Sequence, residues 1–360
     1  MGILRKDHLL FLSLLFLIFL GLMILASISS NETIRFYSLK RQILFLVISL
    51  VFFFILSNLD WRGWINSSFI LAFYFLSIFL LILVLIIGSN IKGARGWFQI
   101  GNFSFQPLEL AKLSLVLVLA KFLSSHHKRL WQYPLLLKTT FFSFLPIFFV
   151  MIQPDLGGAM VLFLIWFFLV LISGIKLKQV LLIFLIIFLG LIFCWFFILK
   201  PYQKARIISF LYPEADPLGS GYNRLQALIA IGSGRIFGKG LGWGSQTQFR
   251  YLPLAKTDFI FSALAEEMGL IGISLFLVLF LVFLSRLVYW ANNFSNNFCA
   301  FFTISFALKI LAETTINILM NLGLIPIVGI GLPFLSLGGS QLLINFIFLG
   351  IISSMINNPG

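Results

Sequence analysis

Long apolar runs separated by short polar breaks recur along the whole chain. A helix needs about 20 mainly apolar residues to cross the hydrocarbon core of a bilayer. The pattern therefore predicts ten membrane-spanning helices, at residues 8–28, 41–57, 68–88, 108–124, 134–152, 156–173, 178–199, 257–284, 298–325 and 334–355. We expect an all-α polytopic membrane protein that folds as one domain over residues 1–360, with a long loop at about 200–256 between the seventh and eighth helices.

The composition agrees with a membrane protein. Of the 360 residues, 61% are hydrophobic and 10% are charged, and the mean hydropathy is +1.09. Soluble domains carry roughly a quarter charged residues, so a cytosolic enzyme, a fibre and a disordered chain are excluded. No internal repeat is visible at a fixed period, which disfavours a transporter built from inverted repeats. Cys194 and Cys299 both lie in apolar runs, so neither a disulfide framework nor a CxxC metal or redox site is expected.

The charge balance is strongly basic, with 25 Lys and Arg against 11 Asp and Glu and a net charge of +14. These basic residues are scattered between apolar runs and form no dense block or aromatic RNA-binding motif, so we expect no nucleic-acid partner. An anionic lipid or an anionic substrate at the membrane surface fits better.

The orientation follows from the even number of spans and from the basic residues in the loops. The first run lacks a small-residue cleavage site and is predicted to be a retained span rather than a signal peptide. The long loop is rich in basic residues, but long loops translocate largely regardless of charge. With that loop discounted, both termini are predicted to be cytoplasmic and the long loop extracytoplasmic. Its basic residues would then bind an anionic ligand or would simply be solvated.

Two charged residues lie together at the start of the fourth predicted helix. Glu109 and Lys112 are three residues apart on one helix face, just after Pro107, which suits a first helical turn. Ionisable groups inside a span are costly and by default face a protein interior or a cavity. The two residues would form a structural ion pair that neutralises itself, or they would line a cavity.

Two aspartates lie at predicted helix starts. Asp155, in the polar break at 153–158, would cap the next helix or would face the same outer cavity as Glu109. Asp258 follows Thr257, the expected N-cap of the eighth helix. For Asp258 to act as a base near neutral pH, partial desolvation must outweigh the helix dipole. It begins a stripe of small residues that lets helices approach closely, namely Asp258, Ser262, Ala265, Gly269 and Gly272.

Other polar residues lie deeper in the predicted spans. Glu266 and Glu267 are interpreted as groups that hydrogen-bond between helices. A self-neutralised packing stripe with a spacing of four is expected in the ninth span, at Lys309, Glu313, Asn317 and Asn321. The segment 332–340 combines a proline, paired glycines and hydroxyls, which predicts irregular backbone at the wall of a cavity.

Nucleotide and metal motifs are not matched. The glycine-rich run 232–242 lacks GxGxxG spacing and has Gly240 where a P-loop needs Ser or Thr. The histidines stand near loop ends without paired metal-ligand spacing, at His8, His126 and His127.

Several segments together resemble the SEDS family of bacterial membrane proteins (RodA, FtsW and SpoVE). Residues 92–97 resemble its NGARRW-type loop, 106–112 its QPSELAK segment, and 153–157 its QPDLG segment. The segments 229–234, 257–261 (TDFIF), 266–269 and 332–340 follow in the order that the family has. Departures from the family pattern are Leu108 for Ser, Gly158 for Thr, Leu254, Ala255 and Lys256 for the usual acid and histidine, and Leu337 for Tyr.

The resemblance implies a ten-span fold with one long outer loop and the activity of a peptidoglycan glycosyltransferase. Such an enzyme polymerises lipid II at the outer face of the bacterial cytoplasmic membrane, usually with a class B penicillin-binding protein as transpeptidase partner. Asp258 corresponds to the family's catalytic aspartate and would act as general base. A single inverting displacement would release undecaprenyl pyrophosphate, helped by a divalent cation such as Mg²⁺ or Mn²⁺. The segments 216–219 and 264–267 resemble RodA more than FtsW, which favours a role in cell elongation and shape over division.

The resemblance also implies a set of substrate and cavity residues. Pyrophosphate would be bound by a subset of Arg95, Arg206, Arg224 and Lys239. The remaining cavity positions are Trp97, Glu109, Lys112, Gln153, Asp155, Ser336 and Ser340. Two other classes of protein compete with the enzyme: a flippase or transporter of a lipid-linked precursor, and a scaffold that only holds a partner synthase. A transporter needs charged groups along a complete path, whereas polymerisation needs Asp258 at the outer end.

Overall fold

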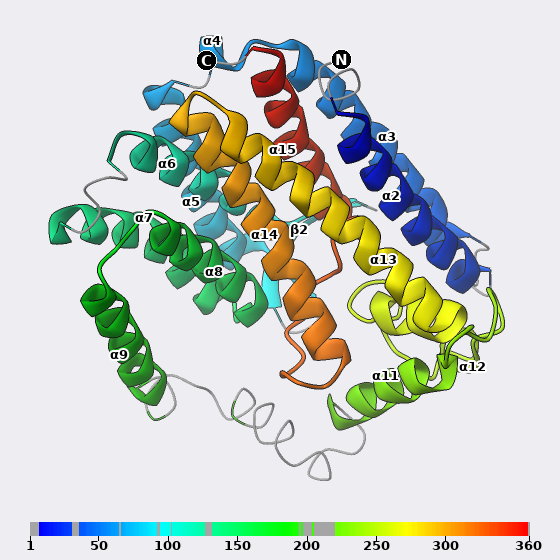
Figure 1. Cartoon of the computed structure of the whole chain (residues 1–360). Coiled ribbons are helices and arrows are strands. Elements are labelled where there is room, and N and C mark those ends of the chain that lie inside the picture. Colours follow the sequence, from blue (N-terminus) through cyan, green and yellow to red (C-terminus); the bar gives the residue numbers. More distant parts are fainter. Residues whose placement is uncertain are drawn as a thin grey trace.

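A computed structural model describes residues 7–30, 36–64, 66–91, 94–101, 103–126, 132–193 and 220–358, together with the single residues Phe196 and Lys204 (Figure 1). A helix lies at each of the ten predicted ranges, which confirms the helical class. These helices are α2 (His8–Ser29), α3 (Tyr37–Asn58), α5 (Ser67–Ile87), α6 (Pro107–His126), α7 (Tyr133–Ile152), α8 (Leu156–Ile172), α9 (Leu177–Phe193), α13 (Ile260–Asn293), α14 (Asn297–Asn321) and α15 (Gly339–Asn357). The shorter helices are α4 (Trp61–Trp64), α11 (Ser220–Gly234) and α12 (Ser245–Gln248).

The apolar helices have the dimensions of membrane spans. In the part of the chain that the structure describes, seven helices are long and apolar enough to cross a bilayer, namely α2, α3, α5, α7, α13, α14 and α15. The helices α8 and α9 have 17 residues each. Large apolar side chains remain exposed on the outer helices, as at Ile86 on α5 (74% exposed) and Leu177 on α9 (73% exposed). Such surfaces are typical of helices that face lipid.

The helices α6 and α14 form the centre of the molecule. The helix α14 packs against α6, α8 and α13, while α15 packs against α3, and α13 also contacts α2 and α11. Figure 1 shows α14 crossing the middle of the bundle between α8 and α13. The first half of α6 is almost wholly buried, so its charged residues lie in the protein interior.

The two ends of the bundle differ in the elements they bear. The first residues of α2 and the last residues of α15 lie at the same end of the bundle, at the top of Figure 1, which agrees with the even number of spans that the sequence predicts. The helices α11 and α12 lie at the opposite end. The start of α13 lies beside α11 and α12 at that lower end (Figure 1).

A small antiparallel sheet was not predicted by the hydropathy pattern. It has the order β1–β2–β3, with β1 at Ser89–Ile91, β2 at Ala94–Ile100 and β3 at Phe103–Phe105. The register pairs Ser89 with Trp97 and Phe98 with Phe105. The sheet fills the connection between α5 and α6. Its strands β1 and β3 have three residues each, which is too short for an alternating pattern in the sequence.

The structure differs from the prediction in the long loop and at the boundaries of two helices. The loop predicted at 200–256 contains α11 and α12, and its residues 200–203 and 205–219 lie outside the described residues. The helix α13 begins at Ile260 and extends to Asn293, well beyond the predicted end at 284. The helix α15 begins only at Gly339 because residues 325–338 form irregular structure, as the proline and glycines suggested.

Candidate active site

Asp258 lies buried, with 4% of its surface exposed, in the run of turns that precedes α13. Its backbone carbonyl accepts hydrogen bonds from Nδ2 of Asn317 (2.9 Å) and Nδ2 of Asn321 (3.0 Å), both on α14. A methyl group built onto Gly329 would lie 3.8 Å from Oδ2 of Asp258. The carboxylate therefore lies where the start of α13, the end of α14 and the irregular segment 325–338 meet.

The predicted N-cap of α13 was wrong. Thr257 does not cap the helix: its hydroxyl donates to the carbonyl of Leu254 at 3.4 Å. The N-cap is Phe259, whose side chain makes no capping hydrogen bond. Turns over residues 253–259 delay the helix by two residues, so Thr257 lies outside it.

The irregular segment 325–338 is held by polar contacts that satisfy its backbone. Asn317 donates to the carbonyl of Ile330 at 2.7 Å. The hydroxyl of Ser336 accepts from the backbone N–H of Leu332 at 2.7 Å and donates to the carbonyl of Thr257 at 2.6 Å. Irregular backbone inside a membrane protein is tolerated where the protein supplies such partners. Ser336 thus ties this segment to the residue next to Asp258.

A pocket of about 390 Å³ is lined by Lys256 and Thr257, the two residues that precede Asp258 in the chain. Its basic side chains are Arg250 and Lys256, and most of the remaining lining is apolar. The wall consists of Ile28, Thr247, Gln248, Leu252, Pro253, Leu254, Ala255, Thr257 and Leu337. An apolar wall with two cations suits an amphipathic anion.

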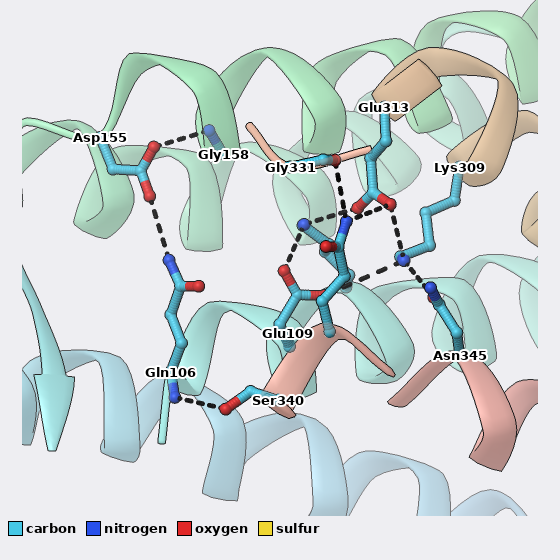
Figure 2. Close-up of polar contacts among 11 residues, drawn as sticks. Gln106, Glu109, Asp155, Gly158, Lys309, Glu313, Gly331, Ser340 and Asn345 are labelled. Carbon is cyan, nitrogen blue, oxygen red and sulfur yellow. Dashed lines mark hydrogen bonds and ion pairs between the residues drawn. The ribbon is translucent and has the colours of Figure 1, made fainter. Parts of the chain in front are cut away.

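The charged residues of α6 and α14 form one buried cluster (Figure 2). Lys112 lies 2.7 Å from Glu109 and 2.7 Å from Glu313, measured from Nζ to the nearest carboxylate oxygen. Lys309 lies 3.0 Å from Glu313 and 3.9 Å from Glu109. Both pairs predicted within single helices form, and Lys112 also joins them across the helix interface. The cluster has two positive and two negative groups, so its formal charge is zero.

Two amides complete the surroundings of this cluster. Gln341 donates to Oε2 of Glu313 at 3.0 Å and to the carbonyl of Gly331 at 3.3 Å, and Lys309 donates to Oδ1 of Asn345 (Figure 2). Gln341 and Asn345 both lie on α15. The predicted site did not include Gln341, Asn345, Lys309 or Glu313. The spacing of four between the two charged residues in an apolar span was the available signal, and it was interpreted as packing.

Asp155 caps α8, as one of the two interpretations predicted. Its Oδ1 accepts from the backbone N–H of Gly158 at 2.7 Å, and its Oδ2 accepts from the side chain of Gln106 at 3.4 Å (Figure 2). Asp155 lies in the turn between α7 and α8, where burial raises the pKa of its carboxyl group above the ordinary range. The nearby carboxylates of Glu109 and Asp258 act in the same direction, against the hydrogen bond from Gly158 and the charge of Lys112.

Other predicted residues tie the sheet and the neighbouring helices together. Ser340 accepts from the backbone N–H of Gln106 at 3.2 Å and donates to the carbonyl of Ser104 on β3 at 3.3 Å. Gln153 is buried and donates to the carbonyl of Leu81 on α5 at 3.0 Å. Ser340 and Gln153 therefore join the sheet and the helices that surround the site.

The strand β2 places two predicted residues at the edge of this region. Arg95 is exposed, and Trp97 is half-buried. The residue between them, Gly96, faces Gln153, since a methyl group built there would lie 3.5 Å from Oε1 of Gln153. Two further pyrophosphate candidates belong to the long loop. Arg224 lies on α11 beside Gly323, where a methyl group built on the glycine would lie 2.5 Å from Nε of Arg224, and Arg206 lies outside the described residues.

Lys239 lies in an ion pair rather than alone. Its Nζ is 2.9 Å from Oε1 of Glu266 and 2.8 Å from the hydroxyl of Ser245. The Glu266 carboxylate also accepts from the backbone N–H groups of Gln246 (2.8 Å) and Thr247 (3.0 Å) in the first turn of α12. The charge of Lys239 is thus matched by a buried acid, and its role in the structure is to fix this loop.

The same loop fills a break in α13. At Gly269 the backbone has φ 64° and ψ −159°, a conformation that suits glycine. The freed carbonyls of Glu266 and Glu267 accept from the N–H groups of Lys239 (2.9 Å) and Gly240 (3.0 Å). Two N–H groups of α13 donate back to carbonyls at 235 and 236. Glu267 also accepts from the hydroxyl of Ser27 on α2 at 2.6 Å, so it links helices as predicted.

The described residues include no group of three histidine, cysteine or acidic side chains arranged to hold a metal ion.

The family model described as "Cell cycle protein", for FtsW, RodA and SpoVE, matches residues 7–358. The chain is 37% identical over 363 residues to the "Probable peptidoglycan glycosyltransferase FtsW" of Wigglesworthia glossinidia brevipalpis, covering 96% of this chain and 92% of that protein. It is 36% identical over 286 residues to the "Peptidoglycan glycosyltransferase MrdB" of Escherichia coli (strain K12), covering 78% of this chain and 76% of that protein.

A solved structure titled "Structural coordination of polymerization and crosslinking by a peptidoglycan synthase complex" contains a chain with the same fold. The TM-score is 0.82 at 31% sequence identity, and the match covers 97% of both chains. The family model spans nearly the whole chain, and the fold agrees over the same length. The chain therefore belongs to the cell cycle protein family of FtsW, RodA and SpoVE.

Proposed function

We propose that this protein is a peptidoglycan glycosyltransferase that polymerises lipid II into glycan strands. The observation that supports the proposal most is that the buried residue Asp258 directly follows Lys256 and Thr257, which line a pocket with a mainly apolar wall and two basic side chains. Relatives at 36–37% identity bear the name of this activity. Lipid II combines an apolar tail with an anionic pyrophosphate, which suits such a pocket.

In the proposed reaction, Asp258 is the general base. Its carboxylate takes the proton from the 4-hydroxyl of the acceptor sugar as that oxygen attacks the anomeric carbon of the donor. The new bond joins O4 to the anomeric carbon, and the bond from that carbon to the pyrophosphate oxygen breaks. The donor is α-linked and the product is β-linked, so one inverting displacement suffices without a covalent enzyme intermediate. Undecaprenyl pyrophosphate leaves with the electron pair of the broken bond.

Basic side chains near Asp258 would stabilise the leaving pyrophosphate. Arg250 and Lys256 line the pocket, and Arg95 is exposed on β2. Charge-assisted hydrogen bonds to phosphate oxygens are strong. Lys239 is a weaker candidate because it pairs with Glu266. A divalent cation such as Mg²⁺ or Mn²⁺ would bind mainly through the pyrophosphate, since magnesium commonly uses substrate phosphates and one or two carboxylates.

The buried charge cluster has a supporting role in this proposal. Glu109, Lys112, Lys309 and Glu313 form ion pairs with one another, and Gln341 connects Glu313 to the carbonyl of Gly331 in the segment that approaches Asp258. The cluster holds α6, α14 and α15 in register around the site. In this proposal the cluster takes no part in proton transfer.

The cellular setting is also proposed. The site would face the outside of the bacterial cytoplasmic membrane, with both termini cytoplasmic. A class B penicillin-binding protein would be the partner, which is supported by the similarity to a chain of a peptidoglycan synthase complex. Relatives include both FtsW and MrdB. We favour a RodA-like role in elongation because of the segments 216–219 and 264–267.

The test is synthesis of glycan from labelled lipid II by the purified protein, with and without a class B partner. Polymer together with released undecaprenyl pyrophosphate is the expected result. A flippase for the lipid-linked precursor is the second candidate, favoured only by the presence of buried charges in the spans. Absence of polymer under all conditions, combined with movement of lipid II across proteoliposome membranes, would replace the enzyme by the transporter.

A further inference from the structure

The first turn of α13 is capped by a residue of another helix. The N-cap position, Phe259, has no polar side chain to accept the free N–H groups of that turn. Oδ1 of Asn321, on α14, accepts instead from the backbone N–H of Ser262 at 3.2 Å and from its hydroxyl at 2.6 Å. Asn321, which is distant in sequence, thus accepts the hydrogen bond that an N-cap side chain normally accepts.

The other end of the same amide holds Asp258. Nδ2 of Asn321 donates to the backbone carbonyl of Asp258 at 3.0 Å. Asn317, one turn earlier on α14, donates to the same carbonyl at 2.9 Å and to the carbonyl of Ile330 at 2.7 Å. Nδ2 of Asn321 also lies 3.2 Å from Oδ1 of Asn317, which links the two amides.

These contacts connect three segments that surround the Asp258 carboxylate. They join α14 to the start of α13, to the backbone carbonyl of Asp258 and to the carbonyl of Ile330. The residue before Ile330 is Gly329, which lies beside Oδ2 of Asp258. Both asparagines are fully buried, with 0% of their surface exposed. A buried carbonyl that loses its donors tends to turn toward another partner, because leaving it unpaired is costly. Turning the Asp258 peptide would redirect its side chain.

We propose that Asn317 and Asn321 are positioning residues that fix the direction of the Asp258 carboxylate for the reaction. This inference rests on the proposed function of Asp258. The asparagine pair touches no reacting atom and acts only through the peptide of Asp258 and the segment at 329–330. The buried cluster of Glu109, Lys112, Lys309 and Glu313 shares no hydrogen bond with the pair among those that the structure gives for its described residues.

The test compares Asn317→Ala and Asn321→Ala with two controls in the same region. Ser262→Ala removes the hydroxyl on Oδ1 of Asn321 but leaves both donors to the Asp258 carbonyl in place. Thr314→Val removes a buried hydroxyl on α14, one turn before Asn317. The near-isosteric Asn317→Asp and Asn321→Asp keep the side-chain volume if the alanine variants do not fold. Each variant is assayed for kcat and KM with lipid II and for melting temperature in detergent.

Positioning predicts that kcat falls about tenfold or more in each asparagine variant, a loss that corresponds to about 1.4 kcal/mol of transition-state stabilisation. KM for lipid II should change little, and both controls should keep kcat near the wild-type value. The double variant should lose less than the product of the two single losses, because both amides hold one carbonyl.

Three outcomes would overturn the proposal. One is an unchanged kcat in folded asparagine variants, and another is a loss that appears as raised KM. The third is a loss that Ser262→Ala and Thr314→Val share in proportion to their melting temperatures. Failure of the proposed function is distinguishable, since it would appear as no polymer from the wild type or as full activity of Asp258→Asn.

Discussion

Lys112 on α6 and Glu313 on α14 are paired across the helix interface, with 2.7 Å between Nζ and Oε1. This contact joins two ion pairs that each lie within one helix into a single neutral cluster. Burying charges costs free energy, and the cost is offset only when every member has partners. The stability of the central helices should therefore depend on the balance of charge in the cluster.

Removing one charge from this cluster should destabilise the protein strongly. Glu313→Gln leaves Lys112 and Lys309 with Glu109 as their only anion within the cluster. We expect the free energy of unfolding to fall by roughly 3–5 kcal/mol, the usual cost of breaking a buried ion pair. The measurement is reversible unfolding in detergent micelles.

The double variant Glu313→Gln, Lys309→Met provides the control, because it restores the neutrality of the cluster. It should be more stable than Glu313→Gln alone. A double variant that is less stable by the sum of both single losses would show that the charges act independently.

The break in α13 should be sensitive to a methyl group. Gly269→Ala places a side chain in the left-handed region, at φ 64°, and its methyl group would overlap the backbone of Ile236 and Gly238. We expect a loss of about 3 kcal/mol in the free energy of unfolding. Gly232→Ala is the matched control on α11, where the methyl group would meet open space. It should be neutral or stabilising by up to about 1 kcal/mol. Equal effects of the two substitutions would argue against strain at Gly269.

The carboxyl group of Asp155 should make stability depend on pH. Burial raises its pKa in the folded state above the ordinary value, so the folded protein binds this proton more tightly than the unfolded chain does. The resulting stabilisation is present at low pH and is lost as pH rises through the raised pKa. Asp155→Asn has no such proton but retains an N-cap oxygen for Gly158.

The difference in the free energy of unfolding, Asp155→Asn minus wild type, should therefore be largest at neutral pH. It should decrease as the solution is acidified. Unfolding of both proteins over this pH range measures it. A difference that grows on acidification would mean that the folded state favours the ionised form.

The sequence predicts the helices better than it predicts their contacts. A helix lies at each of the ten ranges that the apolar runs predicted, and the acidic residue at a helix start located the cap at Asp155. The cap of α13 was missed because its acceptor, Asn321, lies on α14, far along the chain. The pairing of Lys112 with Glu313 is likewise a property of the helix packing, whereas spacing rules describe one helix at a time.

In the candidate site, too, the sequence identified residues better than it identified their contacts. The motif resemblance identified Asp258, and the structure gives its buried position and its contacts with α14. The pairing of Lys239 with Glu266 was not predicted, because it depends on a loop that folds back into a break in α13. Partners near in sequence were thus predictable by residue. For Glu267 the sequence indicated an interhelical role, but it could not identify Ser27 on α2 as the partner.

The central claim is that Asp258 is the base of a glycan polymerase. The most direct test measures the rate of glycan formation from lipid II by wild type, Asp258→Asn and Asp60→Asn, with lipid II binding and melting temperature measured for each. Asp60 is exposed between α3 and α4, where it accepts from the backbone N–H of Arg62, and serves as the matched control. The proposal predicts that Asp258→Asn binds lipid II and folds normally but polymerises roughly 10²–10⁴-fold more slowly, while Asp60→Asn equals wild type. Polymerisation by folded Asp258→Asn at the wild-type rate would contradict it.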